Sequence, residues 1–230
     1  MKLIKYTSLL KNFSIYFTEV ILLNLLAFDT SGSWLTIVLK YGEEIKFSES
    51  KSLKRQSDTL MKEIDELLDS YDLSISKIDL IGCVIGPGNF TGLRSGIAVA
   101  KAIAFSLSLP VVGLKYFDCF KSTDPVVMIR KARKNWWYAS EFDGKGWQCD
   151  LLPSEELKKF NGKMIFSEEQ IAGIYSKVIE GPIISGYDLV EATLKNFNES
   201  RNLYDHISVK PFYVQKPIAE EKVGEKPYEV

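Results

Sequence analysis

Hydrophobic residues in the first half of the chain fall into short unbroken runs and longer amphipathic stretches. Residues 23–29, LNLLAFD, form an apolar run typical of a buried strand, and WLTIVLKYGEEIKFSES predicts two further strands joined at Gly42. Leucine and isoleucine recur at helical spacing over residues 53–71, and the buried strand KIDLIGCVIG follows. A helix over residues 91–108 and the strand PVVGL complete a β-β-β-α-β-α-β order.

The second half of the chain has a less regular pattern. A β-hairpin closed by DGKG is predicted for PVVMIRKARKNWWYASEFDGKGWQ. A short helix is predicted for PSEELKKF and a strand for KMIFS. EEQIAGIYSKVIE has a weak helical pattern, while GPIISGYDLVEATLKNFNES predicts a strand, a glycine turn and a helix. The tail contains three prolines and is expected to be extended.

These patterns predict an α/β protein of two lobes joined near residues 115–125. We assign residues 23–118 to the first lobe and residues 119–230, with the tail, to the second. Residues 1–22 are expected to be an N-terminal extension, with folding sequence starting near Leu23. Charged and polar residues interrupt its apolar stretch before it reaches the ~18 residues of a membrane span. One hypothesis is that this extension does not belong to the native protein.

The composition excludes several classes of function. The chain has 46% hydrophobic residues, enough for a proper core, and 29 basic against 30 acidic residues. With a net charge of -1, contact with a nucleic acid would need a local basic patch or a partner. The three cysteines, Cys83, Cys119 and Cys149, are far apart and lack CxxC spacing. They are interpreted as packing residues in a cytoplasmic protein.

The glycine-rich segment GPGNFTGLRSG lies between a predicted strand and the predicted helix. Gly86 and Gly88 flank a proline in an unusual turn, and Thr91 is the expected cap of a helix that opens at Gly92. Free amides at a helix start would suit an anion, although the P-loop lysine is missing. Gly92 and Gly96 lie one turn apart and would let another helix approach closely. Phosphate binding and close packing both remain open from this segment.

Other candidate residues for chemistry are few. Asp29 ends the first predicted strand and is followed by TSGS, so it would either bind magnesium or phosphate, or accept hydrogen bonds from its own turn. His206 is the only histidine, so a catalytic triad or a histidine metal site lacks parts. RKARKNWWY mixes basic and aromatic residues, which suits nucleic acid but also suits a hairpin with aromatic faces.

Three stretches resemble one family of proteins. LLAFDTSGSWLTIVL, IGCVIGPGNFTGLRSGIAVAKAIA and KPFYVQKPIAE are similar to the TsaB (YeaZ) family, and the resemblance covers residues 23–221. It implies an actin-like, Hsp70-like (ASKHA, ribonuclease H-like) fold of two lobes with mixed sheets flanked by helices. It also implies a cytoplasmic, non-catalytic subunit needed to make N6-threonylcarbamoyladenosine in tRNAs that read codons beginning with adenine.

The resemblance further implies partners and site residues. The partners are TsaD and the ATPase TsaE, with tRNA reached through the complex and ATP, ADP and a metal bound by the partner subunits. The sequence leaves open whether the chain forms a homodimer through the same helices when TsaD is absent. Asp29, Gly86 and Gly88 would be remnants of phosphate loops. The implied interface residues are Leu60, Ile64, Leu67, Thr91, Gly92, Arg94, Ser95, Gly96 and Val99.

The sequence also departs from the family pattern. Gln56-Ser57 stands where the family often has His-Ser, and Lys131-Ala132-Arg133 replaces Asp-Ala-Arg. SGYD, around Gly186, lacks the glycine pair with which nucleotide-binding relatives hold adenosine. An ATPase or small-molecule kinase of the same fold is the alternative function, and it would need a working adenosine site. A protease is disfavoured because metal-binding histidines are missing.

Overall fold

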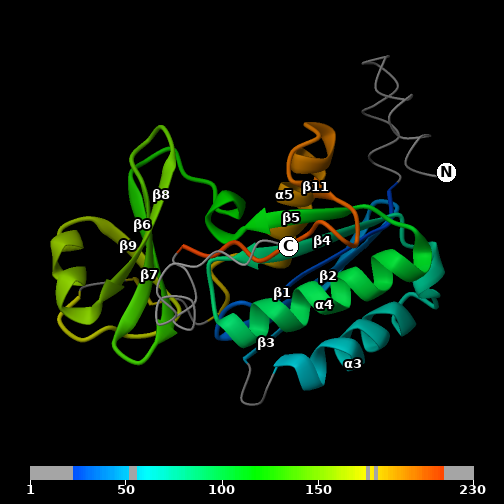
Figure 1. Ribbon diagram of the computed structural model, residues 1–230, viewed down its shortest axis with the longest axis horizontal. Coiled ribbons are helices and arrows are strands. Elements are labelled where there is room, and N and C mark those ends of the chain that lie inside the picture. Colours follow the sequence, from blue (N-terminus) through cyan, green and yellow to red (C-terminus); the bar gives the residue numbers. More distant parts are fainter. Residues whose placement is uncertain (1–22, 52–55, 175–176, 179–180, 215–230) are drawn as a thin grey trace, which may run out of the picture.

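Continuous apolar runs build the sheet at the centre of the larger lobe (Figure 1). The computed structural model describes residues 23–51, 56–174, 177–178 and 181–214. Every residue of β1 (Leu25–Asp29) and β4 (Leu80–Gly86) is buried, and the two strands pair in parallel. A parallel pair covered on both faces needs such unbroken apolar runs, which explains why these strands were predictable.

The first sheet has six strands in the order β11-β5-β4-β1-β2-β3. β2 (Trp34–Tyr41) pairs antiparallel with β1 and with β3 (Glu44–Lys51), while β5 (Val111–Lys115) lies parallel to β4. This mixed sheet and its helices confirm the predicted β-β-β-α-β-α-β order. The short 3-10 helices η1 (Ile75–Lys77) and η2 (Tyr116–Cys119) precede β4 and follow β5.

Helices cover both faces of the first sheet. α3 (Gln56–Asp69) and α4 (Phe90–Leu107) lie side by side on one face (Figure 1), where their apolar residues share a core with Leu26 and Phe28. α5 (Gly186–Asn198) covers the opposite face with Leu25 and Ala27. Successive residues of β1 therefore supply two separate cores, as the alternation of side chains along a strand requires.

The boundaries of the helices agree with the sequence pattern, but one cap does not. α4 begins and ends one residue before the predicted bounds of 91–108. Its cap is Asn89, whose side chain accepts a hydrogen bond from the Gly92 N–H at 3.0 Å, so the prediction of Thr91 as the cap is wrong. The start predicted for α3, at residue 53, lies outside the described residues.

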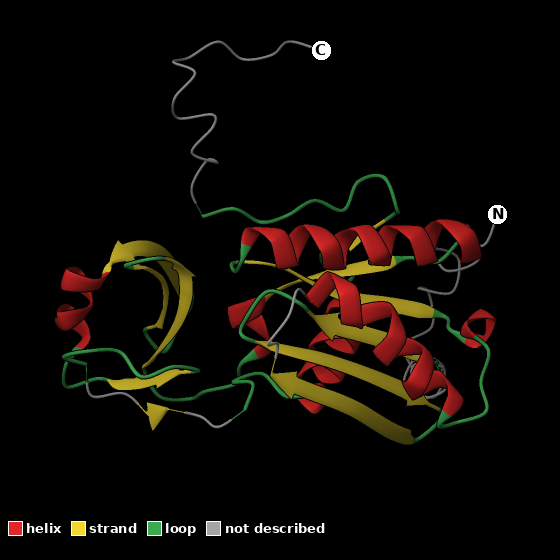
Figure 2. Ribbon diagram, turned by 90° about the horizontal axis from the view of Figure 1, so that it is seen from below, coloured by secondary structure: helices red, strands yellow, loops and turns green. Residues whose placement is uncertain are grey.

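The smaller lobe is built mainly from strands (Figure 2). Its sheet has the order β10-β9-β6-β7-β8 and comprises β6 (Val126–Arg133), β7 (Trp136–Phe142), β8 (Trp147–Pro153), β9 (Met164–Ser167) and β10 (Lys177–Val178). The predicted single hairpin is a three-stranded meander, because a turn at Lys134 and Asn135 joins β6 to β7 before DGKG joins β7 to β8.

Two of three other local predictions for this lobe are confirmed. PSEELKKF forms a short helix, the 3-10 helix η3 (Ser154–Phe160), with Leu157 and Phe160 buried. In the described part of EEQIAGIYSKVIE there is no helix, and the short strand β10 lies there instead. The strand KMIFS is confirmed as β9.

The chain returns to the first lobe after completing the second. α5 packs on the first sheet, and β11 (Leu203–Tyr204) pairs antiparallel with β5. The expectation that all of residues 119–230 belong to the second lobe is therefore corrected for residues 186–204. The apolar face of α5 needs a sheet to cover it, and the first sheet has one face left open by α3 and α4.

The cysteines are free thiols within packed regions. Cys83 and Cys119 are buried and Cys149 is half-buried. Burial raises the pKa of Cys149 to about 11, although a hydrogen bond from Ser140 opposes the shift. A thiol with so high a pKa stays protonated at neutral pH, which agrees with a packing role.

Candidate functional site

The residues predicted as phosphate loops meet at one edge of the first sheet. Asp29 ends β1 and Gly86 ends β4, and parallel strands bring their carboxyl ends to the same edge. The Asn89 N–H donates to the carbonyl of Ser31 at 2.7 Å, which ties the glycine-rich loop to the turn after β1. Asp29 and the glycine-rich loop, which are distant in sequence, therefore lie side by side.

Contacts within the chain account for the glycines of this loop. A Cβ at Gly88 would overlap the carbonyl oxygen of Ser31, and one at Gly86, whose φ is +139°, would overlap the carbonyl oxygen of Phe212. The Phe212 N–H in turn donates to the carbonyl of Ile85 at 2.7 Å. In the structure these glycines allow close packing of backbone against backbone, which is one of the two roles that the sequence left open.

The carboxylate of Asp29 is held by its own turn and by the second lobe. Its Oδ1 accepts hydrogen bonds from the backbone N–H of Ser31, at 2.7 Å, and from the Ser31 hydroxyl. Its Oδ2 accepts from the Nη2 of Arg130 at 3.3 Å. Asp29 is buried, so these partners replace water around its charge.

Arg130, near the end of β6, forms the centre of the junction between the lobes. Its side chain is only 4% exposed, and Nη1 donates to the Ser31 hydroxyl at 2.8 Å. Nη2 also lies 3.5 Å from Oε1 of Glu168, and the guanidinium stacks over the ring of Tyr116 at 3.5 Å. A Cβ at Gly32 would overlap Nη2, so the turn after β1 requires glycine where the arginine crosses it.

Two buried carboxylates keep the buried guanidinium charged. Burial by itself would lower the pKa of Arg130, but Tyr116, Glu168 and Asp29 outweigh it and raise the pKa above its ordinary value. Glu168 has further partners, since its Oε2 accepts from the Ser33 N–H at 3.1 Å and its Oε1 from the Tyr116 hydroxyl at 3.4 Å. We name Asp29, Arg130 and Glu168 the junction triad.

The junction triad does not fit a magnesium nucleotide. The carboxylate that would face a metal is paired with Arg130, and the loop that would receive phosphate is closed against Ser31 and Phe212. In the described part of the chain, no group of three or more His, Cys, Asp or Glu side chains is arranged to hold a metal ion. An ion pair within the chain, between Arg130 and Asp29, lies at this edge of the sheet.

Most of the predicted interface residues belong to the core of this chain. Leu60 and Ile64 are fully buried, and Leu67 is nearly so. Gly92 and Gly96 are also buried, and a Cβ at Gly96 would overlap the Thr30 hydroxyl, which donates to the Gly92 carbonyl at 2.8 Å. The assignment of these five residues to a partner surface is corrected. The space beside Gly92 and Gly96 on α4 is filled by Thr30.

The remaining predicted interface residues lie on the outer side of α4. Thr91 and Arg94 are exposed, and Ser95 and Val99 are partly exposed. Arg94 Nε donates to the Tyr213 hydroxyl at 3.2 Å, so the segment before residue 214 borders this side of the helix. α4 has the length and hydropathy of a membrane span, but its buried face packs on the sheet and on α3.

The junction was only partly visible in the sequence. Arg130 was grouped with the exposed basic residues of RKARKNWWY, whereas Tyr116 and Glu168 were not predicted at all. The signal that was available is positional: Arg130 follows the apolar run VVMI, and β6 pairs in parallel with β9, which ends just before Glu168. His206 is partly exposed and packs against the ring of Phe105, with centroids 5.0 Å apart.

The two lobes and the edge between them define an ASKHA-fold protein, and comparison with known proteins gives the family. Residues 50–194, more than half of the chain, match the family described as TsaD: tRNA N6-adenosine threonylcarbamoyltransferase. The chain belongs to the TsaB (YeaZ) family, as the resemblance implied.

Individual relatives have related names. The tRNA threonylcarbamoyladenosine biosynthesis protein TsaB of Haemophilus influenzae is 33% identical over 155 residues, which are 64% of this chain and 66% of that protein. TsaB of Buchnera aphidicola from Acyrthosiphon pisum is 23% identical over 123 residues, which are 50% of this chain and 56% of that protein. The match thus spans less than two thirds of either relative.

Solved structures agree on the fold. The structure described as YeaZ from Pseudomonas aeruginosa superposes with a TM-score of 0.66 at 19% identity, and the match covers 84% of this chain and all of that one. A second crystal structure, described as an uncharacterized protein with similarity to peptidase YEAZ from Pseudomonas aeruginosa, gives a TM-score of 0.68 at 19% identity. The predicted fold class is confirmed.

Replacing Gly88 by alanine tests whether its loop is packed or open. The new methyl group would meet the carbonyl oxygen of Ser31, which is backbone and cannot rotate away, so we expect a loss of about 1–3 kcal/mol in the free energy of unfolding. Gly146→Ala is the control, because no atom lies within 4 Å of its Cβ position. Urea denaturation measures both, and equal stability of the Gly88 variant and the unmutated protein would contradict the packed loop.

Replacing Arg130 by alanine tests the junction triad. The change leaves two buried carboxylates without their cation, so the free energy of unfolding should fall by about 3–5 kcal/mol. Lys163→Ala removes the exposed partner of Glu141 and should cost less than about 1 kcal/mol. Denaturant titration compares the two, and similar small losses would show that Arg130 does not hold the lobes together.

Proposed function

We propose that this chain is a non-catalytic partner subunit required to form N6-threonylcarbamoyladenosine in tRNAs that read codons beginning with adenine. It acts in the cytoplasm as a heterodimer with TsaD, together with TsaE, and reaches tRNA through that complex. ATP, ADP and a metal are bound by the partner subunits. Family membership supports this proposal, since the relatives in Haemophilus influenzae and Buchnera aphidicola are named as biosynthesis proteins for this modification.

The observation that carries the non-catalytic role is the junction triad. A kinase or ATPase of this fold works by holding phosphates and a metal between its lobes, and here the chain's own Arg130 pairs with Asp29 in that space. The adjoining glycine loop is closed by contacts with Ser31 and Phe212. These contacts favour a subunit whose lobes have a fixed arrangement over an enzyme that binds a nucleotide between them.

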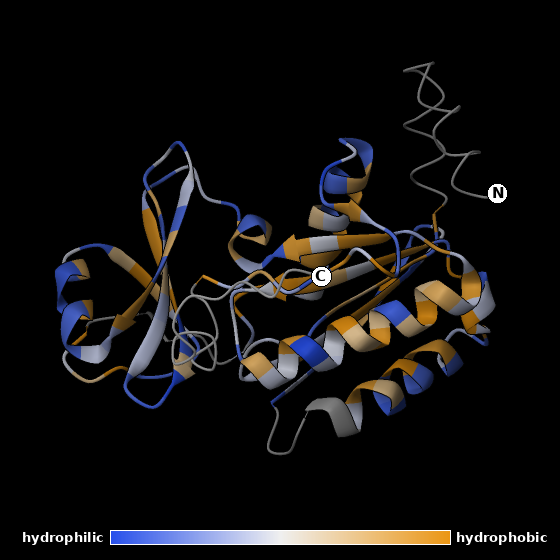
Figure 3. Cartoon of the chain, in the orientation of Figure 1, coloured by the Kyte–Doolittle hydropathy of each residue, from blue (hydrophilic) through white to orange (hydrophobic). Residues whose placement is uncertain are grey.

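The surface that we assign to TsaD is the outer side of α4 with the neighbouring part of α3. Figure 3 shows α4 with long hydrophobic stretches beside polar ones. Phe105 is 68% exposed and Met61 on α3 is 43% exposed, while Ala98 and Ala102 are exposed small residues on α4. Small side chains let a helix from another protein approach closely, and large apolar ones at the ends gain from being covered.

Reconstitution tests the proposed function directly. The purified chain should form no modified nucleoside alone, but should restore formation when mixed with TsaD, TsaE and the enzyme that makes the threonylcarbamoyl precursor. Unchanged modification when this chain is omitted would refute the proposal. Magnesium-ATP titrated into the isolated chain should give no binding heat, whereas tight binding with turnover would favour the ATPase or kinase alternative.

A charge on the outer side of α4 tests the assigned surface. Ala98→Glu should weaken pairing with TsaD at least about tenfold, because an unpaired charge buried at an interface costs more than about 1.4 kcal/mol. Since Ala98 is exposed in the free chain, its stability should not change. Ala172→Glu, also at an exposed alanine, is the matched control in the second lobe.

Calorimetric titration with TsaD and denaturation of each variant separate pairing from folding. Size-exclusion chromatography without TsaD tests whether two copies of this chain pair through the same helices. A homodimer formed in that way should dissociate in Ala98→Glu. Unaltered pairing in that variant would show that TsaD binds elsewhere on the chain.

A further inference from the structure

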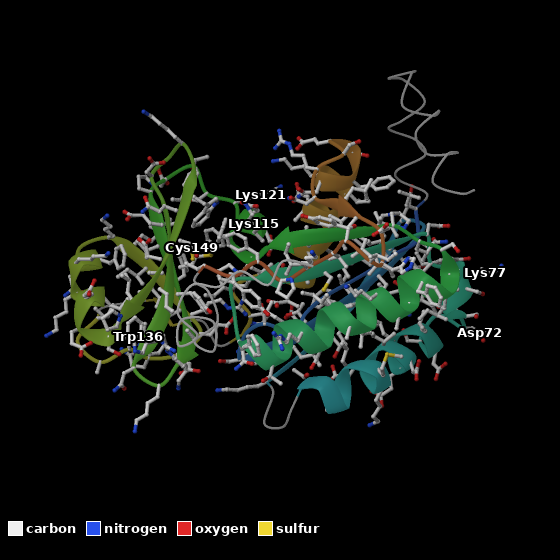
Figure 4. The ribbon with its side chains drawn as sticks, in the orientation of Figure 1. Asp72, Lys77, Lys115, Lys121, Trp136 and Cys149 are labelled. Atoms are coloured by element: carbon white, nitrogen blue, oxygen red, sulfur yellow. The ribbon has the colours of Figure 1, made fainter. Side chains whose placement is uncertain are left out.

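A cleft of about 210 Å³ opens beside the junction triad, between the lobes. Ser33 and Asn89 of the first lobe line one side, and the turn between β6 and β7 lines the other. The end of β6 contributes Lys131 and Arg133, and the turn contributes Lys134; all three are exposed, and we name them the basic rim. Trp136, the first residue of β7, follows the turn at the lower end of the second lobe in Figure 4.

The basic rim carries more positive charge than its surroundings neutralise. Lys131 lies 3.3 Å from Glu169, and both side chains are exposed enough for water to screen that pair. Glu168, the acidic residue among those that line the cleft, pairs with the buried Arg130. Because the whole chain has a net charge of -1, this excess is local and belongs to the cleft.

The wall of the cleft also has an unused hydrogen-bond donor. Arg130 lines the cleft and is 4% exposed, and its buried Nε has no acceptor among the described residues. Buried donors in folded proteins nearly always have a partner, which can be an ordered water or an atom of a ligand. A donor and three cations favour a ligand with anionic oxygen atoms.

The size and lining of the cleft favour phosphodiester groups over a free nucleotide. Its volume is below the roughly 300–1,000 Å³ of most small-molecule sites, but it suits a single phosphate. Arg133 lies over the ring of Trp136 at 4.9 Å, which adds a planar stacking surface beside the cations. Basic and aromatic side chains together are the lining that single-stranded nucleic acids use, phosphates on the cations and bases on the rings.

We propose that the basic rim binds phosphate groups of an RNA backbone, so that this subunit contacts the tRNA itself. The choice of RNA rests on the proposed function, while the choice of phosphate rests on the cleft. The rim would hold RNA independently of sequence, because contacts to phosphate carry no base information. The chain would then contribute substrate affinity in addition to any effect of pairing with TsaD.

The test uses the complete chain, alone and in its complex with TsaD. A triple variant, Lys131→Ala, Arg133→Ala and Lys134→Ala, removes the rim, and its matched control is Lys158→Ala, Lys159→Ala and Lys163→Ala. The control removes the same charge from exposed positions on η3 and beside β9 in the same lobe. Fluorescence anisotropy with a labelled tRNA transcript, between about 50 and 200 mM salt, gives the affinity and its salt dependence.

We expect the rim variant to bind tRNA at least about tenfold more weakly at low salt. The slope of log affinity against log salt should fall by about two to three, close to one for each phosphate contact removed. The control should keep both values, and both variants should unfold at the same denaturant concentration as the unmutated chain. Equal losses in the two variants, or none in the rim variant, would overturn the proposal.

A second titration separates the two sources of phosphate. If the rim variant loses affinity for pyrophosphate without magnesium but binds tRNA as before, the cleft is a small-anion site and the RNA contact is refuted. The RNA contact and the proposed function can also be refuted separately. If modification needs this chain and the rim variant supports modification and binds tRNA as well as the unmutated chain does, only the RNA contact is refuted. If tRNA binds through the rim but modification is unchanged when the whole chain is omitted, only the subunit role is refuted.

Discussion

One buried guanidinium determines how the two lobes of this protein meet. Arg130 comes from the second lobe, and it reaches Asp29 and the Ser31 hydroxyl in the first. Moving a cation and two carboxylates out of water is costly, and their attraction offsets that cost only when the geometry and the remaining hydrogen bonds are good. The closed arrangement meets that condition, whereas an opened one would separate Arg130 from Asp29 and leave the carboxylate without its cation. The pair therefore favours a single position of the lobes.

The sequence predicted the first lobe well because its core depends on local patterns. β1 and β4 are unbroken apolar runs, and α4 is apolar nearly all round because the sheet and α3 cover it on two sides. The place of α5 was missed, since its amphipathic pattern says that one face is buried but does not say against which sheet. The meander of β6, β7 and β8 was read as one hairpin because the turn at Lys134 and Asn135 lacks glycine.

The candidate site was predictable only where it depends on backbone. Glycines mark places where two segments approach closely, so Gly86 and Gly88 were found, although the approaching segment is the chain itself. Arg130 was missed because a charged residue within RKARKNWWY reads as solvent-exposed, and its acidic partners are distant in sequence. Leu60 was assigned to a partner surface but is buried within this chain. Periodicity predicts that a helix has an apolar face, but it does not say whether that face packs on the same chain or on a partner.

Asn89 connects the two surfaces to which we assign functions. Its side chain caps α4, whose outer side is the proposed surface for TsaD, and the same residue lines the cleft beside the basic rim. A protein bound along the outer side of α4 would therefore end close to the cleft, and an RNA held at the rim would lie next to that protein. Because Arg130 fixes the second lobe against the first, the distance between rim and helix is also fixed. In the proposed role, lobes fixed in this way would align an RNA with a partner's active site better than freely moving lobes would.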